Sequence, residues 1–113
     1  MIQHSDLKHK RIALDSIGYL NRAGMAAGNK GRFKEAEKNL KSALGKIYGI
    51  GLKCLEPKIL NNLGLIYAME GRWDKSLFYY NDALEIIEER IGKDNSLYRI
   101  IQKNLTALFQ QHS

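Results

Sequence analysis

The residues of this chain that could perform chemistry are few and poorly grouped. His4 and His9 are five positions apart, which does not place two ligands on one face of a helix, and zinc would need further ligands. We therefore predict no metal site and no cofactor. Cys54 is the only cysteine, so it cannot form an internal disulfide. Its neighbours Leu52 and Leu55 are apolar, which favours a buried, structural role for the thiol.

Two further patterns have the residue types of an active site without its arrangement. Glu85, Glu88 and Glu89 supply carboxylates for acid–base chemistry, but a run of this kind near a helix end is usually a solvated face. The glycines between residues 45 and 51 do not follow a strand, so they do not form a phosphate-binding loop. The sequence thus predicts no catalytic residues and a protein that is not an enzyme.

The composition is that of one folded domain. Of 113 residues, 44% are apolar and 27% are charged. No apolar stretch approaches the length of a membrane span, and residues 1–6 lack the layout of a signal peptide. Together with the single cysteine, these features predict a cytoplasmic protein without a membrane partner.

Charge is distributed unevenly along the chain. Residues 1–58 hold 12 positive and 5 negative side chains, a net charge of +7, whereas residues 59–113 have a net charge of −1. Such a gradient can attract an acidic protein, nucleic acid or a second copy of the chain. A solvated basic surface is the simpler explanation, and we favour it. Nucleic acid is the less favoured partner, because no aromatic interleaving or known reading motif accompanies the charge.

The chain repeats itself with a shift of forty residues. The shift aligns identical or similar residues in pairs: Leu20/Leu60, Asn21/Asn61, Gly24/Gly64, Gly31/Gly71, Arg32/Arg72, Phe33/Trp73, Ala36/Ser76, Ala43/Ala83 and Leu44/Leu84. Because glycine weakens a helix, Gly24 and Gly64 predict places where a second helix approaches closely. We expect Gly64 to face Ser76 or Ala83, since these small residues share one face of the next segment.

The elements that follow are all helical. Glycines at 31 and 71 predict turns inside two helix pairs, Pro57 suits the first turn of a helix, and Asn95 or Ser96 suits an N-cap. The predicted helices cover about residues 6–29, 33–51, 58–70, 73–91 and 97–111.

Residues 57–86 closely resemble one tetratricopeptide repeat. Asn62-Leu63-Gly64-Leu65-Ile66-Tyr67 is similar to the signature of the first helix of that family, and Gly71-Arg72-Trp73 to its turn. Residues 17–46 resemble the same repeat more loosely, with Ala27 in place of the usual Tyr. Residues 99–111 resemble a lone first helix. The period of about forty is longer than the common 34 residues and is similar to that of kinesin light chains.

The resemblance implies an all-α solenoid of antiparallel helix hairpins in a single domain, residues 1–113. It would contain repeat one (about 17–51), repeat two (about 57–91) and a capping helix (about 97–111). In this family the first helices line a concave surface that binds peptides or proteins. Carried over residue by residue, the implied groove consists of Asn21, Arg22, Met25, Asn29, Lys58, Asn61, Asn62, Leu65, Met69, Lys103 and Asn104.

The last predicted helix has more apolar surface than a capping helix needs. Its apolar residues spread over about 200° of the helix circumference, whereas covering one neighbour takes about 100°. A second copy, the N-terminal segment or a downstream domain could cover the rest, and we favour a dimer through Tyr98, Ile101, Leu105, Leu108 and Phe109. The leading hypothesis is a protein-interaction module. The alternatives are a self-assembling structural protein and, third, a nucleic-acid-associated regulator using the basic N-terminal half.

Overall fold

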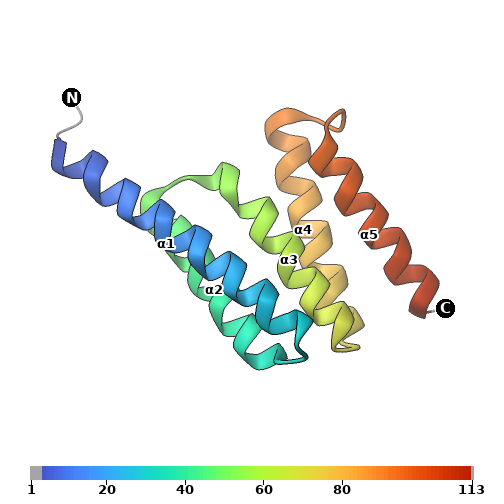
Figure 1. The fold of residues 1–113 in the computed structure, drawn as a ribbon. Coiled ribbons are helices and arrows are strands. Elements are labelled where there is room, and N and C mark those ends of the chain that lie inside the picture. The colour runs from blue at the N-terminus through green and yellow to red at the C-terminus, as the bar shows by residue number, and fades with distance from the viewer. Residues whose placement is uncertain (1–3, 113) are drawn as a thin grey trace. The chain divides into compact units, whose positions relative to one another are not determined.

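The computed structural model describes residues 4–112 and confirms the all-α prediction (Figure 1). In chain order the elements are α1 (His4–Asn29), α2 (Phe33–Ile50), the short 3-10 turn η1 (Lys53–Leu55), α3 (Glu56–Met69), α4 (Trp73–Ile91) and α5 (Ser96–His112). The described range contains no strand. The outermost residues of the predicted 1–113 domain lie outside this range.

The chain divides into two compact units between Lys53 and Cys54. The first unit contains α1 and α2, and the second contains α3, α4 and α5. The predicted repeats are therefore seen as separate helix hairpins, one in each unit. The prediction of one domain with two repeats and a capping helix stays a prediction.

In the first unit, α1 and α2 form an antiparallel hairpin (Figure 1). Gly31 adopts a left-handed backbone with φ of +78°, which glycine reaches without strain and which lets the chain reverse. The Arg32 amide then donates to the Ala27 carbonyl at 2.9 Å and closes the turn. The buried apolar residues of this unit are Ile17, Ala27, Ala36, Leu40, Ala43, Leu44 and Ile47.

The second unit begins with a hairpin of the same design. Gly71 has φ of +79°, and the Arg72 amide donates to the Tyr67 carbonyl at 2.8 Å. The predicted turn glycines are thus confirmed in both hairpins. The buried apolar residues of α3, α4 and α5 are Ile59, Leu60, Leu63, Ile66, Tyr67, Tyr80, Ala83, Ile87, Tyr98, Ile101 and Leu108.

Gly64 lies at a close contact between α3 and α4. The Ser76 hydroxyl donates to the Gly64 carbonyl at 2.7 Å, so the predicted approach to Ser76 is confirmed. The space in front of the Gly64 Cα is filled by Tyr80, because a Cβ built there would lie 2.5 Å from Tyr80 Cε1. The pattern of small residues found the contact but did not find the tyrosine that occupies it.

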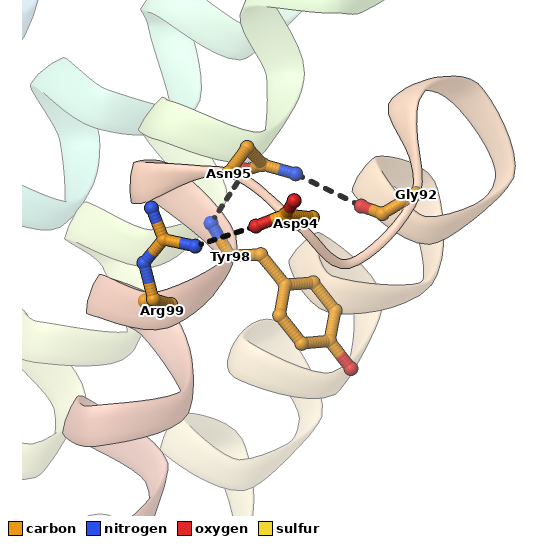
Figure 2. A network of polar contacts seen from close by, with 5 residues as sticks. All are labelled: Gly92, Asp94, Asn95, Tyr98 and Arg99. Atoms are coloured by element: carbon orange, nitrogen blue, oxygen red, sulfur yellow. Dashed lines mark hydrogen bonds and ion pairs between the residues drawn. The ribbon is translucent and has the colours of Figure 1, made fainter.

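An asparagine connects α4 to α5, as Figure 2 shows. The Tyr98 amide donates to Asn95 Oδ1 at 2.8 Å, and Asn95 Nδ2 donates to the Gly92 carbonyl at 2.9 Å. Of the two predicted N-caps, the structure selects Asn95. Arg99 adds an exposed ion pair with Asp94 at 3.1 Å.

The link between the units differs from its prediction in two respects. Helix α3 begins at Glu56, two residues earlier than predicted, although Pro57 lies in its first turn as predicted. Cys54 is exposed, and its predicted burial is wrong. The physical reason is that Leu52 and Leu55, both half-buried, take the inward positions of this short segment.

Candidate functional site

The groove residues of the first unit lie along one stripe of α1. Asn21 and Met25 are half-buried, whereas Arg22 and Asn29 are exposed. Spacings of three and four residues keep side chains on neighbouring positions of one helix face. The four predicted residues are therefore brought together within this unit and offer amide, guanidinium and thioether groups.

The groove residues of α3 are more varied in exposure. Lys58 is exposed and Met69 is 47% exposed, whereas Asn62 and Leu65 are half-buried. Asn61 is only 6% exposed. The Asn61 side chain consequently points into the fold, so it is less accessible to a ligand than the other groove residues of α3.

A hydrogen bond between α3 and α5 explains the burial of Asn61. Asn104 Nδ2 donates to Asn61 Oδ1 at 2.9 Å. A buried amide needs such a partner, since leaving its oxygen without one would cost about 1–3 kcal/mol. The pair fixes the spacing of the two helices, so the predicted groove residues Asn61 and Asn104 act within the unit as a structural cross-link.

A hollow of about 320 Å³ lies beside this cross-link, within the second unit. Four predicted groove or self-association residues line it: Leu65, Met69, Asn104 and Leu108. The sequence did not single out the remaining lining residues, which are Ala68, Tyr80, Ala107 and Gln111. Ala68 and Ala107 leave room because their side chains are short. The signal that could have found Gln111 is its spacing of seven from Asn104, two helical turns along the same face.

The walls of the hollow combine apolar surface with a few polar groups. Leu65, Met69 and Leu108 supply aliphatic and thioether contacts, while the amides of Asn104 and Gln111 can both donate and accept hydrogen bonds. Burial raises the pKa of Tyr80 to about 12, and its hydrogen bond with Ser76 works in the opposite direction. The Tyr80 phenol is therefore neutral at physiological pH.

The exposed charges of α3 and α5 are positive. Helix α5 contains no Asp or Glu, and Glu56, the one acidic residue of α3, is only 6% exposed. Lys58 and Lys103 are both exposed, and no ion pair to either is found in the described chain. This surface favours a negatively charged ligand.

The residues predicted for self-association divide into two groups. Tyr98, Ile101 and Leu108 are at most 8% exposed, so a second chain could reach them only if α5 moved. Leu105 is half-buried and Phe109 is 56% exposed. The dimer through α5 stays a prediction, and Leu105 and Phe109 are the residues of the set that remain accessible for it.

The remaining chemical candidates lie apart from one another. His9 is exposed on α1, and Glu85 and Glu89 are exposed on α4. Glu88 forms an ion pair with Lys93 at 3.5 Å. Among the described residues, no group of three or more His, Cys, Asp or Glu side chains could hold a metal ion. Within the same range, no helix has the length and apolar character needed to span a bilayer.

Two helix hairpins with glycine-marked turns, followed by a further helix, define the class of helical-repeat proteins. Two family models, both described as tetratricopeptide repeat, match residues 55–113 and residues 17–45. The chain belongs to the tetratricopeptide repeat family. Repeats of this family are generally protein-interaction modules and typically non-catalytic scaffolds. A comparison with curated proteins gave no match. The finer resemblance to kinesin light chains stays a prediction.

Proposed function

We propose that this protein binds a peptide or a protein segment on the first helices of its repeats, and that it is not an enzyme. The observation that carries the proposal is the hollow of about 320 Å³ between α3 and α5. Its size suits a single large side chain, and apolar surface combined with polar groups in the lining is typical of a binding site.

The chemistry of the lining indicates what the ligand presents. Leu65, Met69 and Leu108 favour an aliphatic or aromatic side chain, and methionine adapts its shape to the group it meets. Asn104 and Gln111 can bind the amide groups of a peptide backbone. Lys58 and Lys103 favour carboxylates next to that anchor residue. The expected ligand is therefore an apolar residue flanked by Asp or Glu.

The proposal can be tested with random peptides displayed on phage and selected on the wild-type chain. We expect the selected peptides to share one apolar residue next to acidic residues. Ala107→Met would fill part of the hollow, and Lys58→Ala with Lys103→Ala would remove the positive charge. Each change should weaken the binding of a selected peptide about tenfold, which corresponds to about 1.4 kcal/mol.

The matched control is Lys10→Ala with Arg11→Ala, which removes the same charge from exposed positions of α1. This control should leave the affinity for the peptide unchanged, and circular dichroism should show equal helical content in all variants. Peptides that bind the Ala107→Met variant as tightly as the wild type would contradict the proposed anchor site.

A further inference from the structure

One face of α2 is basic and uncovered. Lys34 and Lys38 are exposed on the side of the helix opposite the buried residues, and Lys46 is exposed at the edge of that side. In the described chain none of the three forms an ion pair. Gly45 and Gly49 lie on the same side, and outside the neighbouring backbone of their own helix no atom comes within 4 Å of the position that a Cβ would take. We call this surface the basic face of α2.

The corresponding face of α4 is acidic and carries an aromatic ring. Asp74, Glu85 and Glu89 are exposed, and within the described part of the chain they too form no ion pair. Phe78 lies between them on the same face and is 56% exposed. Its ring rests edge-on against Tyr79, at a centroid distance of 5.2 Å. We call this surface the acidic face of α4.

The two faces occupy equivalent positions of the repeat. The forty-residue shift pairs Lys34 with Asp74, Lys38 with Phe78, Gly45 with Glu85 and Gly49 with Glu89. Positions that hold lysine on α2 thus hold a carboxylate or an aromatic ring on α4. Positions that hold glycine on α2 hold glutamate on α4. The two surfaces therefore carry charges of opposite sign, and the acidic face has long side chains at positions where the basic face has glycine. We propose that the acidic face of α4 binds the basic face of α2 of a second copy of this chain.

The physical contributions to this contact differ in kind. The unpaired charges attract over a range set by ionic strength and mainly orient the two copies and speed their encounter. Phe78 supplies the apolar contact, since a ring that becomes buried at the centre of an interface contributes more than charges at its rim. Gly45 and Gly49 let that ring reach the helix backbone, because they have no side chain to hold it away.

A second copy is the occupant that the charges favour. Residues 4–53 have a net charge of +7 and residues 54–112 a net charge of −1, so each copy offers both partners of the contact. Both faces are exposed, so each is available to another molecule.

A charge-swap experiment tests the contact. Variant one carries Lys34→Glu and Lys38→Glu, which makes both faces of the copy acidic, and variant two carries Asp74→Lys and Glu85→Lys, which makes both basic. Sedimentation at low and at physiological salt should show that the wild type self-associates, more strongly at low salt. Each variant alone should associate at least about tenfold more weakly, and an equimolar mixture of the two should recover the wild-type affinity.

Two further variants separate this contact from a general effect of charge. Phe78→Ala leaves the net charge unchanged and should weaken self-association about tenfold. Lys10→Glu with Arg11→Glu changes the charge as variant one does, but on α1, and should leave self-association intact. Circular dichroism checks that every variant is folded. A monomeric wild type, a mixture no stronger than its separate components, or a control as weak as variant one would each overturn the proposal.

Discussion

The two hairpins have the same backbone design and different contents. In the α1–α2 hairpin, Gly24 faces Leu40, and a Cβ on Gly24 would lie 2.9 Å from Leu40 Cγ. In the α3–α4 hairpin, Gly64 faces the ring of Tyr80 at shorter distances and also accepts the hydrogen bond from Ser76. Ala36, the counterpart of Ser76, has no hydroxyl and cannot form that bond. The second hairpin therefore adds a specific hydrogen bond and a rigid ring where the first has the flexible side chain of Leu40.

The side chains near the turn of each hairpin differ even more. Tyr67 is fully buried and stacks on Tyr79 at a centroid distance of 5.4 Å, with Arg72 Cζ 5.3 Å and Lys75 Nζ 5.4 Å from the centre of its ring. Such contacts between a cation and an aromatic ring stabilise by about 0.5–2 kcal/mol. The first hairpin has Ala27 in place of Tyr67, and its Arg32 pairs instead with Glu35 at 3.8 Å. One turn geometry is thus compatible with a buried tyrosine or with an alanine at the same position of the repeat.

Of the substitutions that test the difference between the two hairpins, Tyr67→Ala should have the largest effect on stability. Removing a fully buried aromatic side chain should lower the free energy of unfolding by about 3–5 kcal/mol, measured by urea denaturation. Tyr19→Ala in the first hairpin is the control, because Tyr19 is 66% exposed and its loss should change stability by at most about 0.5 kcal/mol. A loss below about 1 kcal/mol for Tyr67→Ala would show that the cluster contributes little.

High pH should destabilise the second hairpin. The pKa of Tyr80 is raised from 10.0 to about 12 by burial, so the folded state holds the phenolic proton more tightly than the unfolded state does. This stabilisation is fully present below pH 10 and is lost as the pH rises towards 12. The difference amounts to about 2–3 kcal/mol. Urea denaturation between pH 9 and 12 measures it.

Tyr80→Phe is the matched variant for the pH experiment, because it keeps the ring and removes the titrating group. Leu40, the counterpart of Tyr80 in the first hairpin, does not ionise. The variant should therefore lack this part of the decline in stability. A wild type and a variant that decline in parallel over the same pH range would contradict the assignment to Tyr80.

Alanine substitutions at the glycines test the comparison of the two hairpins through the smallest expected changes in stability. Gly64→Ala places a methyl group 2.5 Å from a buried ring and should cost about 1–3 kcal/mol in thermal or urea unfolding. Gly24→Ala meets the more flexible Leu40 and should cost less. Gly45→Ala meets nothing within 4 Å and should stabilise the chain by up to about 1 kcal/mol, the helix propensity gained. Equal effects at Gly64 and Gly24 would remove the proposed difference between the hairpins.

Much of this fold could be predicted from spacing alone. The forty-residue shift located both hairpins and their turns, and the predicted helices ended close to the observed bounds of α1, α2 and α4. These features depend on glycine and on apolar periodicity, which are local properties of the chain. The start of α5 could also be predicted from a local signal, the N-cap residue Asn95.

The details that could not be predicted depend on which side chain fills a given space. Sequence spacing assigned Asn61 to the groove, but its hydrogen bond to Asn104, forty-three residues away, buries it. Sequence spacing also did not reveal that the Tyr80 ring occupies the space in front of Gly64, or that Ala68 and Ala107 leave a hollow. Helical periodicity gives the face on which a residue lies, whereas these features depend on the rotamers and sizes of residues on two different helices.

The turns at Gly31 and Gly71 also set how fast each hairpin can assemble. In both hairpins the central contact, Gly24 with Leu40 and Gly64 with Tyr80, joins residues sixteen positions apart. Closing so short a segment of chain costs little entropy, and helical proteins with local contacts of this kind fold within about microseconds to milliseconds. Each hairpin can therefore form its own nucleus while the rest of the chain is still unfolded. Folding could then begin in either hairpin, and on the ribosome the α1–α2 hairpin would be the first to have its complete sequence available.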